Sequence, residues 1–332
     1  MIQIFSNYSN IPQEIRYDLE EANIFYTGAY ENYIRSCGHK CIYAYDEGVM
    51  LVIVIRKKLI FKYAVLPSEP FSNREYDQKV FLNEVVGSLK RRLHWISQTN
   101  ATANFVQYPD ESIRIPFGNY IIDLTKDDTE LFSGVTSKCR NMIRRAERDG
   151  VQIIRGGIEL LDKYMSCDIK TWKRSDIDKD NRKVYMDYLQ NMGENACIYI
   201  AEKEGEVQGG ALFLKNRAMS YYLYGATADK PSPGAMNLLQ WKAIVDFKYE
   251  GVKRHSFVGC RINVDKDSKY YGIQSFKKSF GGELVEGFMF KSILHPKIYK
   301  GFNLMYQIRY GGKRTGHDII DQEIHKWKEL NR

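Results

Sequence analysis

The sequence predicts an α/β protein made of two similar units that share an interface. Its 332 residues exceed the usual size of one domain and fit two domains of about 150 residues each. A strand-like stretch that begins at residue 41 recurs at residue 197. Patterns of helical periodicity flank both stretches. We therefore expect two tandem units that arose by internal duplication.

The repeat consists of two patterns of three strands. The first begins CIYAYDEG at residue 41 and continues through VMLVIVI to LIFKYAVLPSEP, and the second begins CIYIAEKEG at residue 197 and continues through EVQGGALFL to AMSYYLYGATADKP. Gly48 and Gly205 follow acidic residues at the points where a hairpin turn needs positive φ. Chance similarity of two short strand patterns remains the alternative.

Apolar periodicity predicts helices around these strands, and they fall at residues 14–38, 77–98, 128–149, 157–173, 181–195 and 235–249. Further strands are predicted at residues 151–155, 253–258 and 283–290. The order helix, three strands, helix, strand, helix, strand is that of an acetyltransferase-like (GNAT-type) unit. We expect a first domain at residues 1–126 and a second at 127–297, with a C-terminal helix at 298–332 that packs back on the first.

The composition indicates a basic, folded protein. Its 49 basic and 41 acidic residues give a formal charge of +8, which favours an anionic partner: a phosphate, a tRNA acceptor end or an anionic membrane surface. No secretory signal is visible at the N-terminus, and the longest apolar run, residues 49–55, is far shorter than the roughly 20 residues that span a bilayer. We expect a cytoplasmic location.

The six cysteines are best interpreted as thiols, because a reducing compartment disfavours disulfides. Cys37, His39 and Cys41 form the only tight cluster of soft ligands. Since no second cluster completes a tetrahedral site, we predict no metal.

Two segments could bind anions. Arg140, Arg144 and Arg148 are spaced to line one face of a helix, where they could hold phosphates or simply face solvent. The loop before the helix at 235–249 lies where acyl-CoA-dependent acetyltransferases bind pyrophosphate through backbone amides. Pro231 and Pro233 remove two of those amide donors, which argues against standard CoA binding without excluding it.

The stretch SFKKSFGG, which begins at Ser275, sets two lysines between two phenylalanines. Phe276 and Phe280 are four residues apart, so they should anchor one face of a short helix in the core. Lys277 or Lys278 could then reach into a cleft while the other stays in water, although two solvent-facing lysines remain the plain alternative.

Four segments carry a resemblance to a known family: SKCRNMIRRAERDGV at 137–151, YYLYGATADK at 221–230, LLQWKAI at 238–244 and, most specific, YYGIQSFKKSFGGELVE at 270–286. On them the chain resembles the FemABX family of non-ribosomal peptidyltransferases, which build peptidoglycan cross-bridges from aminoacyl-tRNA. The family is built from two acetyltransferase-like domains, in agreement with the repeat. Because no heptad run is present, the chain resembles the FemX-like members that lack a helical arm.

The resemblance implies that an amine of a cell-wall precursor attacks the ester carbonyl of an aminoacyl-tRNA, and Lys277 matches the family lysine that stabilises the oxyanion. The residues that we expect to bind substrate are Tyr222, Tyr224, Arg140, Arg144, Arg261 and Tyr271. No cofactor is implied beyond the co-substrate aminoacyl-tRNA. The acceptor is a UDP-linked or lipid-linked muropeptide, and peripheral contact with the inner membrane face stays open.

The general base is not assigned by the resemblance. Where many family members have Asp-Pro, this chain has Tyr108-Pro109, with Asp110 close by. Two other functions therefore remain open at this point. One is an acyl-CoA-dependent N-acyltransferase that acts on an amino sugar in surface polysaccharide biosynthesis, and the other is a catalytically silent scaffold that associates with tRNA or a membrane.

Overall fold

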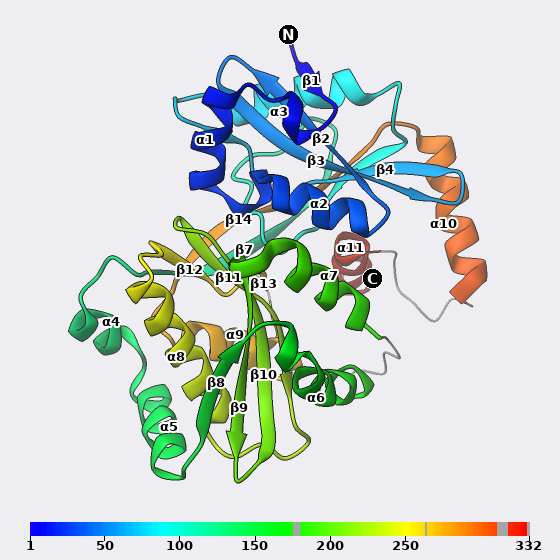
Figure 1. The fold of residues 1–332 in the computed structure, drawn as a ribbon. Coiled ribbons are helices and arrows are strands. Elements are labelled where there is room, and N and C mark those ends of the chain that lie inside the picture. Colours follow the sequence, from blue (N-terminus) through cyan, green and yellow to red (C-terminus); the bar gives the residue numbers. More distant parts are fainter. Residues whose placement is uncertain (175–179, 263, 311–317, 331–332) are drawn as a thin grey trace.

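A computed structural model describes residues 1–174, 180–262, 264–310 and 318–330 (Figure 1). One twisted sheet runs through the whole molecule in the order β1-β2-β3-β4-β6-β14-β7-β12-β11-β10-β9-β8. Helices cover it in both halves, so the α/β class predicted from the sequence is confirmed. None of the described helices is long and apolar enough to cross a bilayer.

The first unit contains the first copy of the repeat. Its elements are β1 (Gln3–Phe5), α1 (Gln13–Ala22), α2 (Gly28–Ser36), β2 (Lys40–Asp46), β3 (Val49–Lys58), β4 (Phe61–Val65), β5 (Phe71–Ser72), α3 (Gln78–Leu89) and β6 (Trp95–Gln98). β2, β3 and β4 form an antiparallel meander, and β6 then pairs in parallel with β4. Gly48, with φ of 88°, closes the first hairpin as predicted.

Two helices predicted in this unit are wrong in extent. The helix predicted at 14–38 is divided into α1 and α2, because the side chains of Asn23 and Thr27 accept hydrogen bonds from backbone amides and start new turns. The helix predicted at 77–98 ends at Leu89, and the following residues enter the sheet as β6. Burial of Trp95 against Tyr63 and Phe302 overrides the helical pattern there.

The second unit repeats this arrangement. Its elements are α4 (Asp128–Gly134), α5 (Ser137–Arg148), β8 (Gln152–Gly156), α6 (Leu161–Lys173), α7 (Arg182–Met192), β9 (Ala196–Lys203), β10 (Glu206–Lys215), β11 (Met219–Thr227), α8 (Ala235–Tyr249), β12 (Arg254–Ser256), β13 (Cys260–Arg261) and α9 (Lys269–Lys278). β11 and β12 are parallel, as β4 and β6 are. The helix predicted at 128–149 is two helices, because Thr136 caps α5 through the amide of Cys139.

The two units are joined by an exchange of strands at the centre of the sheet. β7 (Ile113–Asp123) follows the first unit in the chain but pairs with β12 of the second. β14 (Glu283–Ile293) follows the second unit but pairs with β6 of the first. β7 and β14 also pair with each other, with Phe117 opposite Gly287. Each unit therefore completes the sheet of the other, and the interface is built from backbone hydrogen bonds.

The C-terminal segment differs from the single helix predicted at 298–332. It contains two helices, α10 (Pro296–Tyr310) and α11 (Ile319–Leu330), while residues 311–317 and 331–332 lie outside the described part. Tyr299 and Phe302 of α10 pack on the first unit around Trp95. Ile320 of α11 packs on β7 and β14. The tail therefore covers both the first unit and the central strands.

Candidate functional site

Helix α9 carries the two adjacent lysines at its C-terminal end. The rings of Phe276 and Phe280 lie 5.2 Å apart, and Phe280 packs on Phe257 in the core. With this face buried, the side chain of Lys277 is drawn inside and retains only 7% exposure, while Lys278 stays in solvent. The structure therefore distinguishes the two lysines in burial, and the role of Lys277 in catalysis stays a prediction.

The ammonium of Lys277 donates hydrogen bonds to two backbone carbonyls. Its Nζ lies 2.6 Å from the oxygen of Val258 and 2.7 Å from that of Gly259. An ammonium has three N–H donors, and these two bonds are the ones found among the described residues. The arrangement holds the charge from one side and leaves one donor for a further acceptor.

The turn that supplies these carbonyls lies between the units. Val258 has φ of 43°, a conformation that is strained for a β-branched residue. The amide of Gly259 donates to the carbonyl of Ala101, at 2.9 Å, and a Cβ on Gly259 would come within 2.7 Å of Phe117. Close packing against the first unit therefore positions the two acceptors of Lys277.

Burial lowers the pKa of Lys277 to about 8, because no carboxylate compensates for the loss of water around its ammonium. The thiol of Cys260 lies close by, and burial raises its pKa, so it remains a neutral neighbour. Lys277 is thus protonated at neutral pH but close to its titration point. Such a cation can stabilise a developing oxyanion, and it loses this ability as the pH rises above about 8.

An NMR titration of Cε-labelled lysines tests this directly. We expect one resonance, which disappears in Lys277→Gln, to titrate near pH 8, well below the other lysines. Because the folded pKa is the lower one, the unfolded chain binds more protons between about pH 8 and pH 10.4, and this group makes stability rise with pH in that window. A midpoint above about pH 10 would contradict the buried, uncompensated ammonium.

Gly281 ends α9 in a conformation that only glycine adopts easily. Its φ is 83°, and a Cβ would come within 2.7 Å of the backbone of Gly134 in α4. We expect Gly281→Ala to lower the free energy of unfolding by about 2–4 kcal/mol, from backbone strain and the clash together. Gly251→Ala is the matched control, since Gly251 has φ of 80° but nothing within 4 Å of a Cβ, and should cost only about 1 kcal/mol. Equal losses in urea denaturation would exclude the close packing of α4 on α9.

The two tyrosines predicted to bind substrate lie on opposite faces of the sheet. A β-bulge in β11, at Leu223, shifts the pairing with β10 between Tyr222 and Tyr224. Tyr222 packs in the core beneath α5 and α8, next to Phe213, and burial raises its pKa to about 12. Tyr224 packs beside Tyr185 of α7, at 4.9 Å between rings. The hydroxyls of Tyr222 and Tyr224 are therefore not presented on the same surface of the sheet.

Arg261 and Tyr271 lie beside α9 but in different environments. Arg261 forms an ion pair with Glu323 of α11, donates to Gln322 and stacks on Tyr270 with 4.3 Å from guanidinium to ring. Tyr271 is exposed on α9. In this fold the guanidinium of Arg261, which was predicted to bind substrate, is bound instead by side chains of α11.

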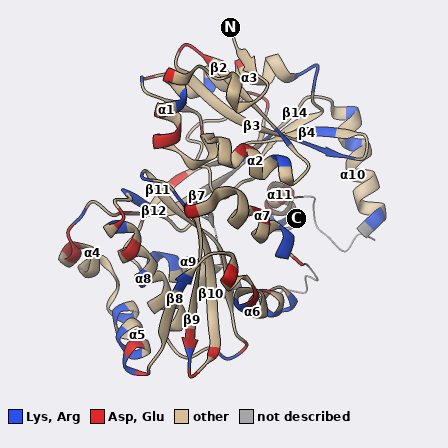
Figure 2. Ribbon diagram, in the orientation of Figure 1, with Lys and Arg blue, Asp and Glu red and all other residues tan. Residues whose placement is uncertain are grey.

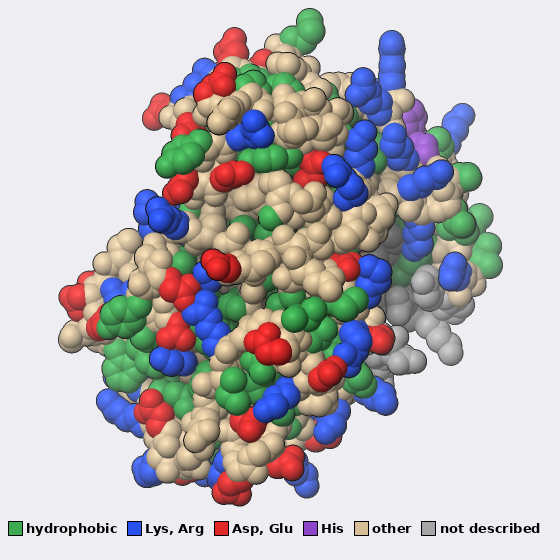
Figure 3. Space-filling view, viewed as in Figure 1, with side chains coloured by type: hydrophobic (Ala, Val, Ile, Leu, Met, Phe, Trp, Pro, Cys, Tyr) green, Lys and Arg blue, Asp and Glu red, His purple; other side chains and the backbone are tan. Residues whose placement is uncertain are grey.

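The predicted arginines of α5 also differ from each other. Arg140 donates hydrogen bonds to the carbonyls of Phe132, Ser133 and Val135, and it closes the connection between α4 and α5. Arg144 is exposed and lies 5.6 Å from the ring of Phe132. Basic side chains recur along α5 (Figure 2). Basic and acidic side chains are nevertheless interspersed over the second unit on the face that Figure 3 shows.

The loop before α8 is unsuited to cradle a pyrophosphate. Gly234 has φ of 83°, and a Cβ there would clash with the carbonyl of Met142 in α5, so the helix N-terminus is packed against another helix. The amide of Ser232 already donates to the side chain of Gln208, at 2.8 Å. Together with the two prolines, this leaves few amides for a phosphate.

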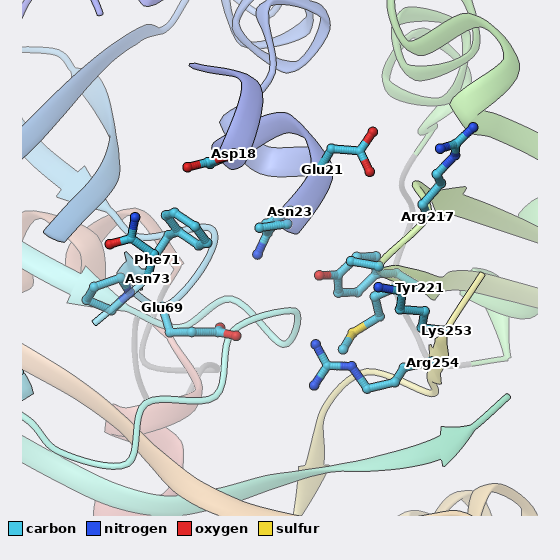
Figure 4. Close-up of a pocket in the computed structure, with 14 residues that line it drawn as sticks. Asp18, Glu21, Asn23, Glu69, Phe71, Asn73, Arg217, Tyr221, Lys253 and Arg254 are labelled. Carbon is cyan, nitrogen blue, oxygen red and sulfur yellow. The ribbon is translucent and has the colours of Figure 1, made fainter. Parts of the chain in front are cut away.

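Sequence reasoning missed a cleft between the two units. It has a volume of about 610 Å³ and is lined by α1, by the segment that follows β4 and by the first residues of β11 and β12 (Figure 4). A neighbouring cavity of about 650 Å³ shares Glu69 and Arg254 with it. Glu69 in the PSEP segment was the one sign of this cleft in the sequence. The residues that face it across the cleft belong to the other unit, so the sequence did not bring them together.

The comparisons with known proteins agree with this architecture. The model of the FemAB family matches residues 106–208 and 202–307. The crystal structure of FemX superposes with a TM-score of 0.68 at 16% identity, over 90% of this chain and 99% of that one. A tandem GNAT protein from the clavulanic acid biosynthesis pathway gives a TM-score of 0.50 at 9% identity, over 89% and 99%. The predicted pair of GNAT-type units is thereby confirmed.

A curated relative is also similar in sequence. It is a lipid II:glycine glycyltransferase of Staphylococcus haemolyticus, 27% identical over 146 residues, which cover 43% of this chain and 34% of the relative. The chain spans about a third of the length of the curated relatives it matches.

Proposed function

Because the chain belongs to the FemAB family, we propose that it is an aminoacyltransferase that moves an amino acid from aminoacyl-tRNA to an amine of a peptidoglycan precursor. The observation that carries this proposal is the buried ammonium of Lys277, held by two carbonyls at the interface between the units. Tyr271 and Tyr224 are proposed to contact substrate. Arg144 is proposed to contact phosphate.

The reaction needs little beyond placement and charge. The amine nitrogen attacks the ester carbonyl, whose π electrons move to oxygen, and Lys277 donates a hydrogen bond to that oxyanion. The C–O bond to the tRNA ribose then breaks, and the ribose oxygen takes up the proton that the amine loses. Since an ester is already activated, direct transfer in a ternary complex suffices.

The proposed acceptor is a lipid-linked precursor, because curated relatives are named lipid II:glycine glycyltransferases. Such an acceptor places the enzyme at the cytoplasmic face of a membrane, as a peripheral protein. The excess of basic residues suits both an anionic membrane surface and tRNA.

A transfer assay tests the proposal. Charged tRNA with a labelled amino acid is incubated with the protein and either lipid II or the UDP-linked muropeptide, and label in the precursor is measured. We expect transfer to lipid II, and transfer only to the UDP-linked form would move the acceptor to the soluble pool. Label that moves from acetyl-CoA, and never from tRNA, would overturn the proposed donor. The crowded loop before α8 already disfavours acetyl-CoA as the donor.

A further inference from the structure

The cleft between the units has walls of opposite charge. Its carboxylates come from the first unit and its cations from the second, and they are Asp18, Glu21 and Glu69 on one side and Arg217, Lys253 and Arg254 on the other (Figure 4). Within the described part of the chain, none of these six side chains takes part in a recorded ion pair. Two unpaired walls of opposite sign attract a ligand that carries both charges.

Tyr221 places a polar group at the floor of this cleft. Its side chain is 3% exposed, and its ring packs against Phe25 at 5.2 Å. Its hydroxyl points into the cleft, toward the space between Glu69 and Arg254 (Figure 4). Burial raises the pKa of Tyr221, so the hydroxyl is neutral and can donate or accept. Because Tyr221 lines the cleft, its hydroxyl can form a hydrogen bond with a ligand there.

Glu69 is held in position by the first unit. Its Oε2 accepts a hydrogen bond from the amide of Asn104, at 3.2 Å. Burial raises the pKa of Glu69, while Arg254 across the cleft favours the ionised form. A ligand ammonium placed beside it would likewise favour the carboxylate and gain a charge-assisted hydrogen bond.

The position of Glu69 can be compared with that of the Lys277 carbonyls, because both follow a pair of parallel strands. Glu69 follows the carboxyl end of β4, which runs parallel to β6. The carbonyls that hold Lys277 follow the carboxyl end of β12, which runs parallel to β11. Carboxyl ends of parallel strands are preferred sites for ligands in α/β sheets. In the repeat β4 corresponds to β11 and β6 to β12, so Glu69 and the Lys277 carbonyls follow different strands, but both lie at the carboxyl end of a parallel pair.

We propose that this cleft is a second ligand site, which binds a zwitterionic amine such as a whole short peptide, with an ammonium at Glu69 and the carboxylate at Arg254. Tyr221 bridges the two groups. A purely anionic ligand would face three carboxylates, and a purely cationic one would face three cations, so the combination of charges is what the cleft selects. This inference does not rest on the proposed transferase activity.

Calorimetry with the dipeptide L-lysyl-D-alanine tests the proposal on the full chain. We expect binding that weakens about tenfold or more when both amines are acetylated, and again when the carboxylate is converted to an amide. If the dipeptide does not bind, or if the blocked analogues bind equally well, the proposal is overturned.

Variants assign the two ends of the ligand. Glu69→Gln should weaken binding of the parent dipeptide about tenfold but leave binding of the acetylated analogue unchanged. Arg254→Gln should likewise weaken binding of the parent dipeptide about tenfold but leave binding of the amide analogue unchanged. Glu84→Gln and Arg91→Gln, exposed residues outside the cleft, are matched controls that should change nothing. If the walls only hold the units together, Glu69→Gln will lower the melting temperature without changing affinity, which would also refute the proposal.

Discussion

Replacement of Lys277 by alanine is expected to lower the rate of aminoacyl transfer by about 10²–10³-fold, the usual effect of losing one donor to an oxyanion. The carbonyls of Val258 and Gly259 accept hydrogen bonds from the buried ammonium of Lys277 and so fix its position. The measurement is single-turnover transfer from labelled aminoacyl-tRNA, with thermal melting of each variant to confirm folding.

Lys278→Ala is the matched control, because the neighbouring lysine on the same helix is exposed. It should leave the rate within about threefold of the parent, since exposed substitutions usually change little. Lys277→Arg keeps the charge and should recover part of the loss, with activity that persists above pH 8. Equal rates for the alanine variants at positions 277 and 278 would remove Lys277 from the mechanism.

Replacement of Lys291 by alanine is expected to lower the free energy of unfolding by about 3–5 kcal/mol, because it removes a fully buried cation from two partly buried carboxylates and a tyrosine hydroxyl. Lys291 is fully buried on β14, and its Nζ lies 2.9 Å from Asp318, 2.8 Å from Asp321 and 2.7 Å from the hydroxyl of Tyr299. These contacts tie α10 and α11 to the central strand. Urea denaturation measures the loss.

Lys300→Ala serves as the control for this loss, since Lys300 lies on α10 in solvent. It should change the free energy of unfolding by less than about 0.5 kcal/mol. A loss below about 1 kcal/mol in Lys291→Ala would show that α10 and α11 are held by apolar packing and not by this lysine.

The two buried lysines differ in pKa because their surroundings differ. Lys277 is surrounded by carbonyls and apolar groups, so burial lowers its pKa to about 8. Lys291 has two carboxylates, which raise its pKa and keep it charged. Only the first is close to titration at neutral pH, which is the property expected of a functional group.

Much of the local structure could be predicted from the sequence. Gly48 and Gly205 mark hairpin turns because both adopt positive φ, which other residues resist. Phe276 and Phe280 predicted which side of α9 is buried, because residues four apart share a helix face. Helix ends were predicted less well, since capping by Asn23, Thr27 and Thr136 interrupts patterns that are otherwise continuous.

By itself, the sequence determined the two repeated units, their hairpins and the buried phenylalanine face of SFKKSFGG, because strand alternation, turn residues and helix periodicity are local properties. Only the tertiary structure decided that β7 and β14 exchange between units, that a bulge separates Tyr222 from Tyr224, and that Glu323 pairs with Arg261. The tertiary structure also decided that Glu69 and Arg254 face each other across the cleft. Each joins residues far apart in the chain, and such contacts depend on packing that no local pattern encodes.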